Sequence, residues 1–254
     1  MGGPSLQQAP GTRRGDPLTT TLHLPSFFSS DTALVEGEVH HHLFKVKRLQ
    51  AGERLRVIDG EGHARWAEIT GIDQRAARLR LGDAAPANEP EVAVEIFVAA
   101  PKPDRAAWLV EKATELGVVA IHFISTEREA RSMEGSQLAR LRRIAVAAVE
   151  QSCRSAVPRL SSEVGLRAAV ALSREAGLPM AVLDAAGAAP VPAMAAGGRI
   201  GLFAGPEGGW SADERAFFRD QELPAWSLGR TVLRVETAAV IAAALVLCGG
   251  GLSR

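Results

Sequence analysis

Residues 200–214, IGLFAGPEGGWSADE, join an apolar run, a glycine-rich loop and the start of a helix. The run from Ile200 to Ala204 predicts a buried strand, and Ser211 and Glu214 have the spacing of a capping box at a helix N-terminus. Because glycine has no Cβ, the loop between them can bring backbone N–H and C=O groups directly against a ligand. This order of strand, loop and helix predicts a ligand site in an α/β domain.

A second stretch, residues 225–237 (AWSLGRTVLRVET), repeats the arrangement. Residues Ala225 to Leu228 predict a short strand, Gly229 follows, and an alanine-rich helix comes next. A lone GPEGG is also compatible with a simple strand-to-helix turn. Two such loops so close together favour one small-molecule pocket built mainly from backbone.

The loop sequences do not match the common phosphate-binding patterns. GPEGG fits neither G-x-G-x-x-G nor G-x-x-x-x-G-K-[ST], and no lysine or hydroxyl stands where a phosphate and Mg²⁺ would need it. Glu207 would also repel a triphosphate. A nucleotide-hydrolysing enzyme is therefore disfavoured.

Strands and helices alternate from residue 92 onward, which is typical of an α/β domain with a mostly parallel sheet. Asp104 is the expected N-cap of a helix that Gly117 ends, and Ser136 is the expected start of a long helix. The last helix is apolar nearly all round, which indicates a deep core or a subunit interface. The expected strands are 92–100, 118–125, 179–183 and 199–204, and the expected helices are 104–116, one starting at 136, 166–176, 211–221 and 236–247.

The pattern before residue 90 is different. Residues 1–19 contain almost no apolar side chains and predict a disordered tail. The segment 54–62 predicts a strand that ends in a turn, and segments 64–69 and 76–81 alternate polar and apolar residues. Together they predict a small β-barrel. Residues 86–90, PANEP, are the expected linker.

Bulk charge predicts no polyanionic partner, because 29 Lys and Arg balance 29 Asp and Glu. Residues 128–159 nevertheless contain seven Arg and three Glu, which fits either a phosphate-binding face or a solvated helix face. Two cysteines, Cys153 and Cys248, are too few for a disulfide framework or a zinc site. The longest apolar run has 11 residues, against about 20 needed to span a bilayer, so a cytoplasmic protein without a membrane partner is expected.

Six sequence blocks resemble the bacterial 16S ribosomal RNA (uracil-N3)-methyltransferase family of the SPOUT superfamily. The blocks are HHLFKVKR (41–48), EKATELG (111–117), TER (126–128), EQSCR followed by Val-Pro (150–158), GPEGGWSADE (205–214) and LGRTVLRVETA (228–238). GPEGG alone is moderately specific, whereas all six blocks in this order are highly specific. The resemblance covers nearly the whole chain after the tail.

The resemblance implies an α/β protein with a PUA-like RNA-binding β-barrel over residues 20–90. A SPOUT methyltransferase domain with a trefoil knot is implied over 91–254. It further implies S-adenosylmethionine as cofactor and a homodimer with each site at the subunit interface. The implied reaction methylates N3 of a specific uridine in the 16S ribosomal RNA of the small ribosomal subunit. Three positions depart from the family pattern: Lys47 replaces a common Leu, Arg230 the usual Pro, and Val235 the usual Thr.

Under this interpretation the cofactor lies against the backbone of three segments, with apolar walls for its adenine ring. The expected cofactor-binding residues are Leu183, Phe203, Gly205, Pro206, Glu207, Gly208, Gly209, Leu228, Gly229, Val232 and Leu233.

Methyl transfer to N3 also requires that the N3 proton be removed or that the resulting anion be stabilised. Arg234 is the first catalytic candidate, because a guanidinium can bind a uracil carbonyl and stabilise the uracilate. Glu236 and Glu207 are the candidate bases, since burial favours the protonated form of a carboxyl group and so makes it a better proton acceptor. Glu236 is equally compatible with a purely structural role at a helix N-terminus.

The expected RNA contacts are basic residues of both domains: Lys45, Lys47, Arg48, Arg128, Arg131 and Arg154. Glu150 and Gln151 have helical spacing to Arg154, so pairing within one helix is an equal alternative for that arginine. His41 and His42 are typical of turn residues, and no metal is expected because no cysteine or paired carboxylate lies near them in the sequence.

Two other functions stay open. The nearer one is a SPOUT methyltransferase that acts on another RNA position, because the loops define the cofactor and not the target. The other is a non-catalytic RNA-binding ribosome-assembly factor that kept the fold, in view of the departures at Arg230 and Val235.

Overall fold

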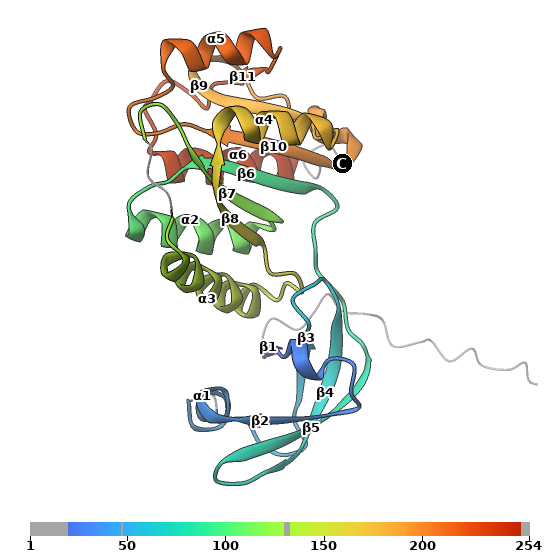
Figure 1. Ribbon diagram of the computed structural model, residues 1–254. Coiled ribbons are helices and arrows are strands. Elements are labelled where there is room, and N and C mark those ends of the chain that lie inside the picture. Colours follow the sequence, from blue (N-terminus) through green and yellow to red (C-terminus); the bar gives the residue numbers. More distant parts are fainter. Residues whose placement is uncertain (1–19, 47, 130–132, 250–254) are drawn as a thin grey trace, which may run out of the picture. The chain divides into compact units, whose positions relative to one another are not determined.

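The computed structural model describes residues 20–46, 48–129 and 133–249, apart from the side chains of Phe27, His42, Lys45, Val46, Glu163 and Ala196 (Figure 1). The chain forms two compact units. One contains the residues up to 59 together with 63–87, and the other contains 60–62 and the residues from 88 onward. The predicted tail, residues 1–19, lies outside the described residues.

The N-terminal unit is a curled five-stranded sheet, a half-barrel, in the order β1-β3-β4-β5-β2. Its strands are β1 (Thr21–His23), β2 (Thr32–Glu36), β3 (Arg54–Ile58), β4 (Ala64–Ile72) and β5 (Ala76–Ala84). Strand β1 runs parallel to β3, and the other pairs are antiparallel. Short helices η1 (Pro25–Phe27), α1 (Gly37–His40) and η2 (His41–Val46) complete the unit, and Leu43 of η2 packs into its core.

The β4–β5 hairpin is longer than the alternation predicts. Strand β4 continues to Ile72, where the side chain of Asp73 closes the turn, and at the far end of the hairpin β5 continues to Ala84, which pairs with Arg65. The Oδ1 of Asp73 accepts hydrogen bonds from the backbone N–H groups of Arg75 (2.9 Å) and Ala76 (2.8 Å). This Asx-type turn is what aligns the two strands.

The C-terminal unit is built on a six-stranded, entirely parallel sheet in the order β11-β9-β10-β6-β7-β8. The strands are β6 (Ala93–Ala99), β7 (Ala120–Ser125), β8 (Arg159–Gly165), β9 (Met180–Ala188), β10 (Arg199–Ala204) and β11 (Ala225–Trp226). The parallel α/β architecture is confirmed. Strand β8 was not predicted, because it is an edge strand of sequence RLSSEVG without an apolar run.

Helices cover both faces of this sheet (Figure 1). One face packs against α2 (Pro103–Leu116), α3 (Gly135–Ser152) and α6 (Val235–Gly249), and η3 (Pro192–Gly197) contacts α6. The other face packs against α4 (Leu166–Glu175) and α5 (Ala212–Asp220). The trefoil knot stays a prediction, since strand order alone does not define how the chain threads.

The predicted helix caps meet different outcomes. The capping box of α5 is confirmed: the N–H of Glu214 donates to Ser211 Oγ (3.0 Å), and the N–H of Ser211 donates to Glu214 Oε2 (2.8 Å). The other two starts are wrong. Helix α2 begins at Pro103, so Asp104 lies inside its first turn, and α3 is capped by Glu134 and begins before Ser136. The fixed φ angle of proline suits the first helical position, so α2 begins at Pro103, before the expected N-cap Asp104.

Candidate active site

The loops after β10 and β11, together with residues 183–185 of β9, line a cavity of about 180 Å³ at the carboxyl ends of β10 and β11. It is lined by segments 183–185, 204–207, 209–210, 226–229 and 231–233, together with Arg215, Val235 and Ala238. This is the edge at which parallel sheets bind ligands. The two glycine loops of the sequence thus form one site, joined by residues 183–185 of β9.

Most of the expected cofactor residues line this cavity: Leu183, Gly205, Pro206, Glu207, Gly209, Leu228, Gly229, Val232 and Leu233. Two expected residues do not line the cavity. Phe203 is fully buried in the core, where its ring stacks on that of Phe97 with 4.4 Å between the ring centroids. Gly208 borders a neighbouring cavity instead.

Trp210 holds the GPEGG loop in place. Its Nε1 donates to the carbonyl of Leu183 (2.9 Å), which ties this loop to the middle of β9. A Cβ added to Gly205 would lie 2.8 Å from the Trp210 ring, so only glycine fits there. Behind the loop, Glu214 Oε1 accepts from the backbone N–H of Glu127 (2.9 Å) and connects α5 to the segment after β7.

Two buried polar atoms beside the cavity have no hydrogen-bond partner within the described ranges. One is the indole Nε1 of Trp226, a donor in the cavity wall, and the other is Oε2 of Glu236, an acceptor next to the lining residue Val235. Buried polar groups are normally paired, so such orphans mark positions where a ligand completes the site. The cavity therefore fits a ligand that has apolar rings and polar edges.

Arg105, which the sequence reading missed, connects the two candidate bases. Its guanidinium contacts the carboxylate of Glu207, and its Nε lies 3.7 Å from Glu236 Oε1. The Glu236 side chain is 7% exposed and that of Arg105 27%. One signal pointed to it: an arginine in the first turn of α2 opposes the helix dipole and so requires another reason to be there.

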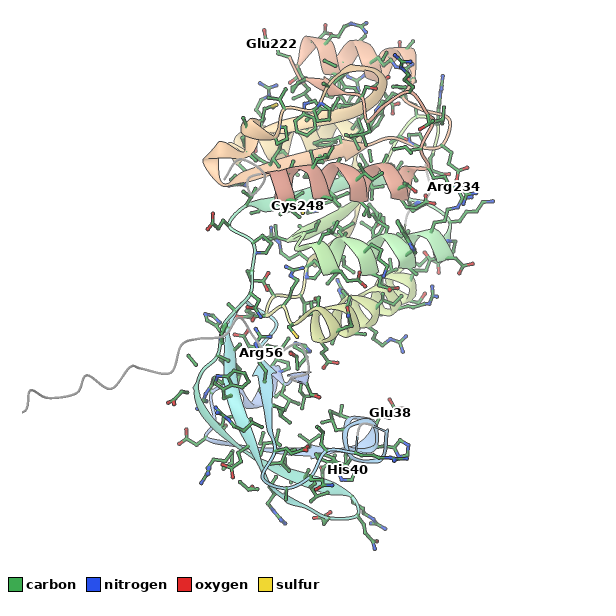
Figure 2. The ribbon with its side chains drawn as sticks, turned by 180° about the vertical axis from the view of Figure 1, so that it is seen from behind. Glu38, His40, Arg56, Glu222, Arg234 and Cys248 are labelled. Atoms are coloured by element: carbon green, nitrogen blue, oxygen red, sulfur yellow. The ribbon has the colours of Figure 1, made fainter. Side chains whose placement is uncertain are left out.

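Arg234, the first catalytic candidate, lies at the protein surface. Its side chain is exposed at the N-terminal end of α6 (Figure 2), and within the described residues it has no partner. Its backbone carbonyl accepts from the N–H of Ala238 (2.9 Å) and starts the helix. The guanidinium is thus available to a substrate.

Asp184 lines the same cavity and is held ionised. Its side chain is 10% exposed, and its carboxylate accepts from Arg215 Nε (2.7 Å) and from the N–H of Ala186 (2.9 Å). Burial disfavours the charged form, but these two interactions outweigh it and lower the pKa of Asp184. Because Arg215 lines the same cavity, this part of the wall is an ion pair with little net charge.

The expected RNA contacts are distributed unevenly. Arg48 is exposed in the N-terminal unit, and Arg128 is exposed beside the GPEGG loop, where it donates to the carbonyl of Gly208. Lys47, Arg131 and the side chain of Lys45 lie outside the described residues. His41 is exposed. The described part of the chain contains no cluster of His, Cys, Asp and Glu able to hold a metal ion.

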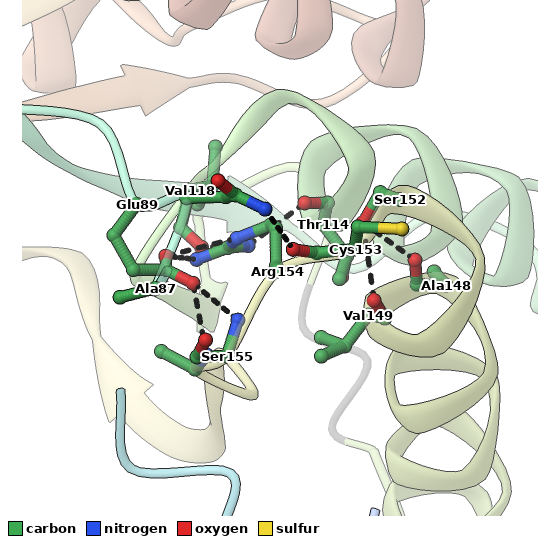
Figure 3. Close-up of polar contacts among 12 residues, drawn as sticks. Ala87, Glu89, Thr114, Val118, Ala148, Val149, Ser152, Cys153, Arg154 and Ser155 are labelled. Carbon is green, nitrogen blue, oxygen red and sulfur yellow. Dashed lines mark hydrogen bonds and ion pairs between the residues drawn. The ribbon is translucent and has the colours of Figure 1, made fainter. Parts of the chain in front are cut away.

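Arg154 is not a surface cation, which corrects its expected contact with RNA (Figure 3). Its side chain is 3% exposed, and its Nε and Nη2 donate to Glu89 Oε2 at 3.0 and 2.7 Å. Nη1 donates to the carbonyls of Thr114 (2.7 Å) and Val118 (3.1 Å). Because α3 ends at Ser152, Arg154 is also not on the helix face that Glu150 and Gln151 share. Its role is to fix the start of the C-terminal unit.

The fold and the site together define an RNA methyltransferase domain preceded by a PUA domain. The family model of the RNA methyltransferase domain matches residues 88–247, and that of the RNA methyltransferase PUA domain matches 35–82. The ribosomal RNA small subunit methyltransferase E of Mycobacterium bovis is 32% identical over 222 residues, which cover 83% of this chain and 84% of that protein. The chain belongs to the ribosomal RNA small subunit methyltransferase E family, within the SPOUT superfamily.

Solved structures agree with this membership. The methyltransferase E of Neisseria gonorrhoeae bound to S-adenosyl methionine has a TM-score of 0.78 at 27% identity, over 89% of this chain and 95% of that chain. A probable rRNA-methyltransferase from Porphyromonas gingivalis has a TM-score of 0.79 at 26% identity, over 92% and 100% of the two chains. In the described residues, no helix is long and apolar enough to cross a membrane.

Proposed function

We propose that this protein methylates N3 of a specific uridine in the 16S RNA of the small ribosomal subunit, with S-adenosylmethionine as methyl donor, in the cytoplasm. The observation that carries the proposal is the backbone-lined cavity at the carboxyl ends of β10 and β11, beside residues 183–185 of β9. The cofactor-bound structure from Neisseria gonorrhoeae supports the choice of ligand. When bound, the cofactor supplies an electrophilic methyl group on a sulfonium centre.

The cavity walls fit this donor. Leu183, Leu228 and Leu233 provide apolar surface for an adenine ring, and the glycine loops offer backbone groups to its edges. Asp184 and Glu207 place carboxylates in the same walls, each of them paired with an arginine. Arg230 is exposed at the rim, so loss of the usual proline changes the stiffness of the loop without filling the cavity. Val235 contributes apolar wall where the usual threonine has a hydroxyl.

Three side chains are the catalytic candidates in this proposal: Glu236, Arg234 and Glu207. The unpartnered Oε2 of Glu236 accepts the N3 proton, since a buried carboxylate oxygen without a donor is poised to bind an N–H group. Arg234 donates to a uracil carbonyl and stabilises the charge that develops on the ring. Glu207 reaches the same space from the GPEGG loop and shares Arg105 with Glu236.

Recognition of RNA and dimer formation belong to the same proposal. Lys45, Lys47 and Arg48 contact RNA from the PUA domain, and Arg128 and Arg131 contact it from the methyltransferase domain. A second copy of the chain covers the exposed apolar side chains of α6, of which Ile241 is 37% and Leu245 40% exposed.

The test is to incubate the protein with methyl-labelled S-adenosylmethionine and undermodified small ribosomal subunits, and to map the labelled nucleoside. Label recovered as N3-methyluridine in 16S RNA is the expected result. Label at another nucleoside would assign the SPOUT chemistry to a different position. Cofactor binding without any label would favour a non-catalytic assembly factor.

A further inference from the structure

A second cavity of about 220 Å³ adjoins the cofactor cavity. Residues 99–102 after β6, Arg128 and Glu129 after β7, and 206–208 of the GPEGG loop form its walls, together with Val235. Pro206, Glu207 and Val235 border both cavities, so the GPEGG loop is a shared wall. Gly208 borders only the second cavity.

A methyl acceptor must occupy a space that touches the cofactor. Direct transfer requires the attacking nitrogen to lie about 3–3.5 Å from the methyl carbon and in line with the breaking bond. A base stacked in a duplex cannot reach that position, so an enzyme that modifies it swings the nucleotide out into a pocket. The second cavity meets the first condition, because it shares three residues with the cofactor cavity.

The walls of this cavity suit a base on one side and a phosphate on the other. Ala99, Ala100 and Pro101 are buried and present apolar surface, while Lys102 and Arg128 are exposed at its edge. Within the described ranges, neither cation has a carboxylate partner. The N-terminus of α2 adds positive potential next to Lys102, and contact with Arg105 offsets the charge of Glu207. Arg128 uses one N–H group on Gly208, which fixes its guanidinium and leaves other donors for a phosphate.

We propose that this second cavity is the target-nucleotide pocket. The flipped uracil ring lies against Ala99–Pro101 and the GPEGG loop, and Lys102 and Arg128 bind the flanking RNA phosphates. This inference rests on the proposed methyl transfer, and it adds the subsite and Lys102 to it.

Gly208→Leu tests the pocket by filling it. A Cβ at Gly208 would meet only Arg128 Cδ, at 3.6 Å, and its backbone is outside the left-handed region, so the added side chain is sterically accepted. We expect the Kd for S-adenosylmethionine, measured by titration calorimetry, to change less than about twofold, while kcat/KM for undermodified small subunits falls about 100-fold or more. The matched control is Gly135→Leu on α3, where nothing lies within 4 Å of an added Cβ.

Removal of the two positive charges at the edge of the cavity is the second test of the proposed pocket. Lys102→Ala and Arg128→Ala should each weaken RNA binding and reduce the slope of log K against log salt by about 1, with cofactor affinity retained. Arg219→Ala, an exposed arginine on α5, should change neither. Transfer by Gly208→Leu within threefold of wild type, or loss of its cofactor binding, would overturn the pocket and leave the proposed function standing. If wild type itself methylates no RNA, the proposed function fails, and binding of a short uridine-containing RNA to these variants still decides the pocket.

Discussion

Arg105 places one guanidinium between two carboxylates that lie far apart in the sequence. It contacts Glu207 of the GPEGG loop and lies 3.7 Å from Glu236 at the start of α6. A buried carboxylate is stable as an anion only when a counter-charge or hydrogen bonds compensate for the water that it loses. At the residue scale, we therefore propose that Arg105 is a positioning residue that holds the candidate base Glu236 in place.

Removal of this contact should affect catalysis more than cofactor binding. We expect Arg105→Ala to lower kcat for methyl transfer about 10- to 100-fold, with little change in the Kd for S-adenosylmethionine. Arg105→Lys keeps the charge and should recover part of the rate. Single-turnover transfer and titration calorimetry on the two variants provide the measurement. Equal loss in both variants would indicate that the fork geometry, not the charge, is what matters.

Glu89 should be essential for stability because of Arg154. Its two oxygens accept from Arg154 and from the N–H groups of Ser155 (2.7 Å) and Ala156 (2.9 Å). Glu89→Ala leaves a buried guanidinium without its anion, and we expect a loss of about 3 kcal/mol in the free energy of unfolding, measured by urea denaturation. The exposed neighbour Glu91→Ala should cost less than about 0.5 kcal/mol. Similar values for both would contradict the structural role of Arg154.

Individual elements are held by contacts that cross strands or close helix ends. Across β6, β7 and β8, His122 joins Glu95 Oε2 (3.1 Å) through Nε2 and Ser161 Oγ (2.7 Å) through Nδ1. The imidazole ring of His122 also stacks on the ring of Phe97, with 4.5 Å between the two ring centroids. At the other end of the sheet, the α5 capping box orients the GPEGG loop.

The hydrogen bond between His122 and Glu95 predicts that the stability of the fold falls at acidic pH. The hydrogen bond from His122 outweighs burial and, with the charges of His122, Arg159 and Arg199, lowers the pKa of Glu95 below its ordinary value of 4.5. A lowered folded-state pKa stabilises the fold above 4.5, and this contribution is lost as pH falls through the folded value. Urea denaturation of Glu95→Gln should therefore show a weaker loss of stability than wild type below pH 4.5. A parallel pH dependence in both proteins would exclude this carboxylate as the source.

The two candidate caps can be compared directly. Ser211→Ala removes a side-chain acceptor for the Glu214 N–H and should cost about 1 kcal/mol of stability. Ser136→Ala, inside the first turn of α3, removes no cap and should cost no stability, because alanine has the higher helix propensity. Thermal unfolding of the two variants checks the difference. A larger effect at position 136 would contradict the observed start of α3.

At the scale of the whole molecule, α6 has two different faces. Its inner face buries Val235, Ala239, Ala242 and Val246 against the sheet and α2, while Ile241 and Leu245 remain partly exposed. The sequence places the helix in a core or at an interface. Within one chain only the inner face of α6 is buried in a core. In the proposed homodimer, the second copy covers the outer face.

The dimer can be tested on this outer face. Ile241→Glu and Leu245→Glu together should increase the dimer dissociation constant at least about 100-fold, because two charges enter an apolar contact. Sedimentation velocity over a concentration series provides the measurement. Leu172→Glu, on the exposed side of α4, is the matched control and should leave the mass unchanged. A monomeric wild type would refute the dimer outright.

The sequence by itself determined what local spacing controls. Apolar runs of strand length, glycines after them and the Ser211–Glu214 box define the parallel α/β unit and two cofactor loops, because each depends on residues a few positions apart. Where two local signals compete, the predicted helix start is wrong. Helix α2 begins at Pro103 and α3 is capped by Glu134, instead of starting at the expected Asp104 and Ser136.

Only the tertiary structure decided which charged side chains meet. Arg105 contacts Glu207 and Glu236, and Arg154 binds Glu89, which is 65 positions away in the sequence. Because these partners are distant in the sequence, local periodicity cannot predict either pairing. The same folding places Phe203 in the core and Gly208 in the wall of a neighbouring cavity, although both were expected to bind the cofactor. Charge and motif alone do not distinguish a surface cation from a buried one, because burial is a property of the packed chain and not of the residue.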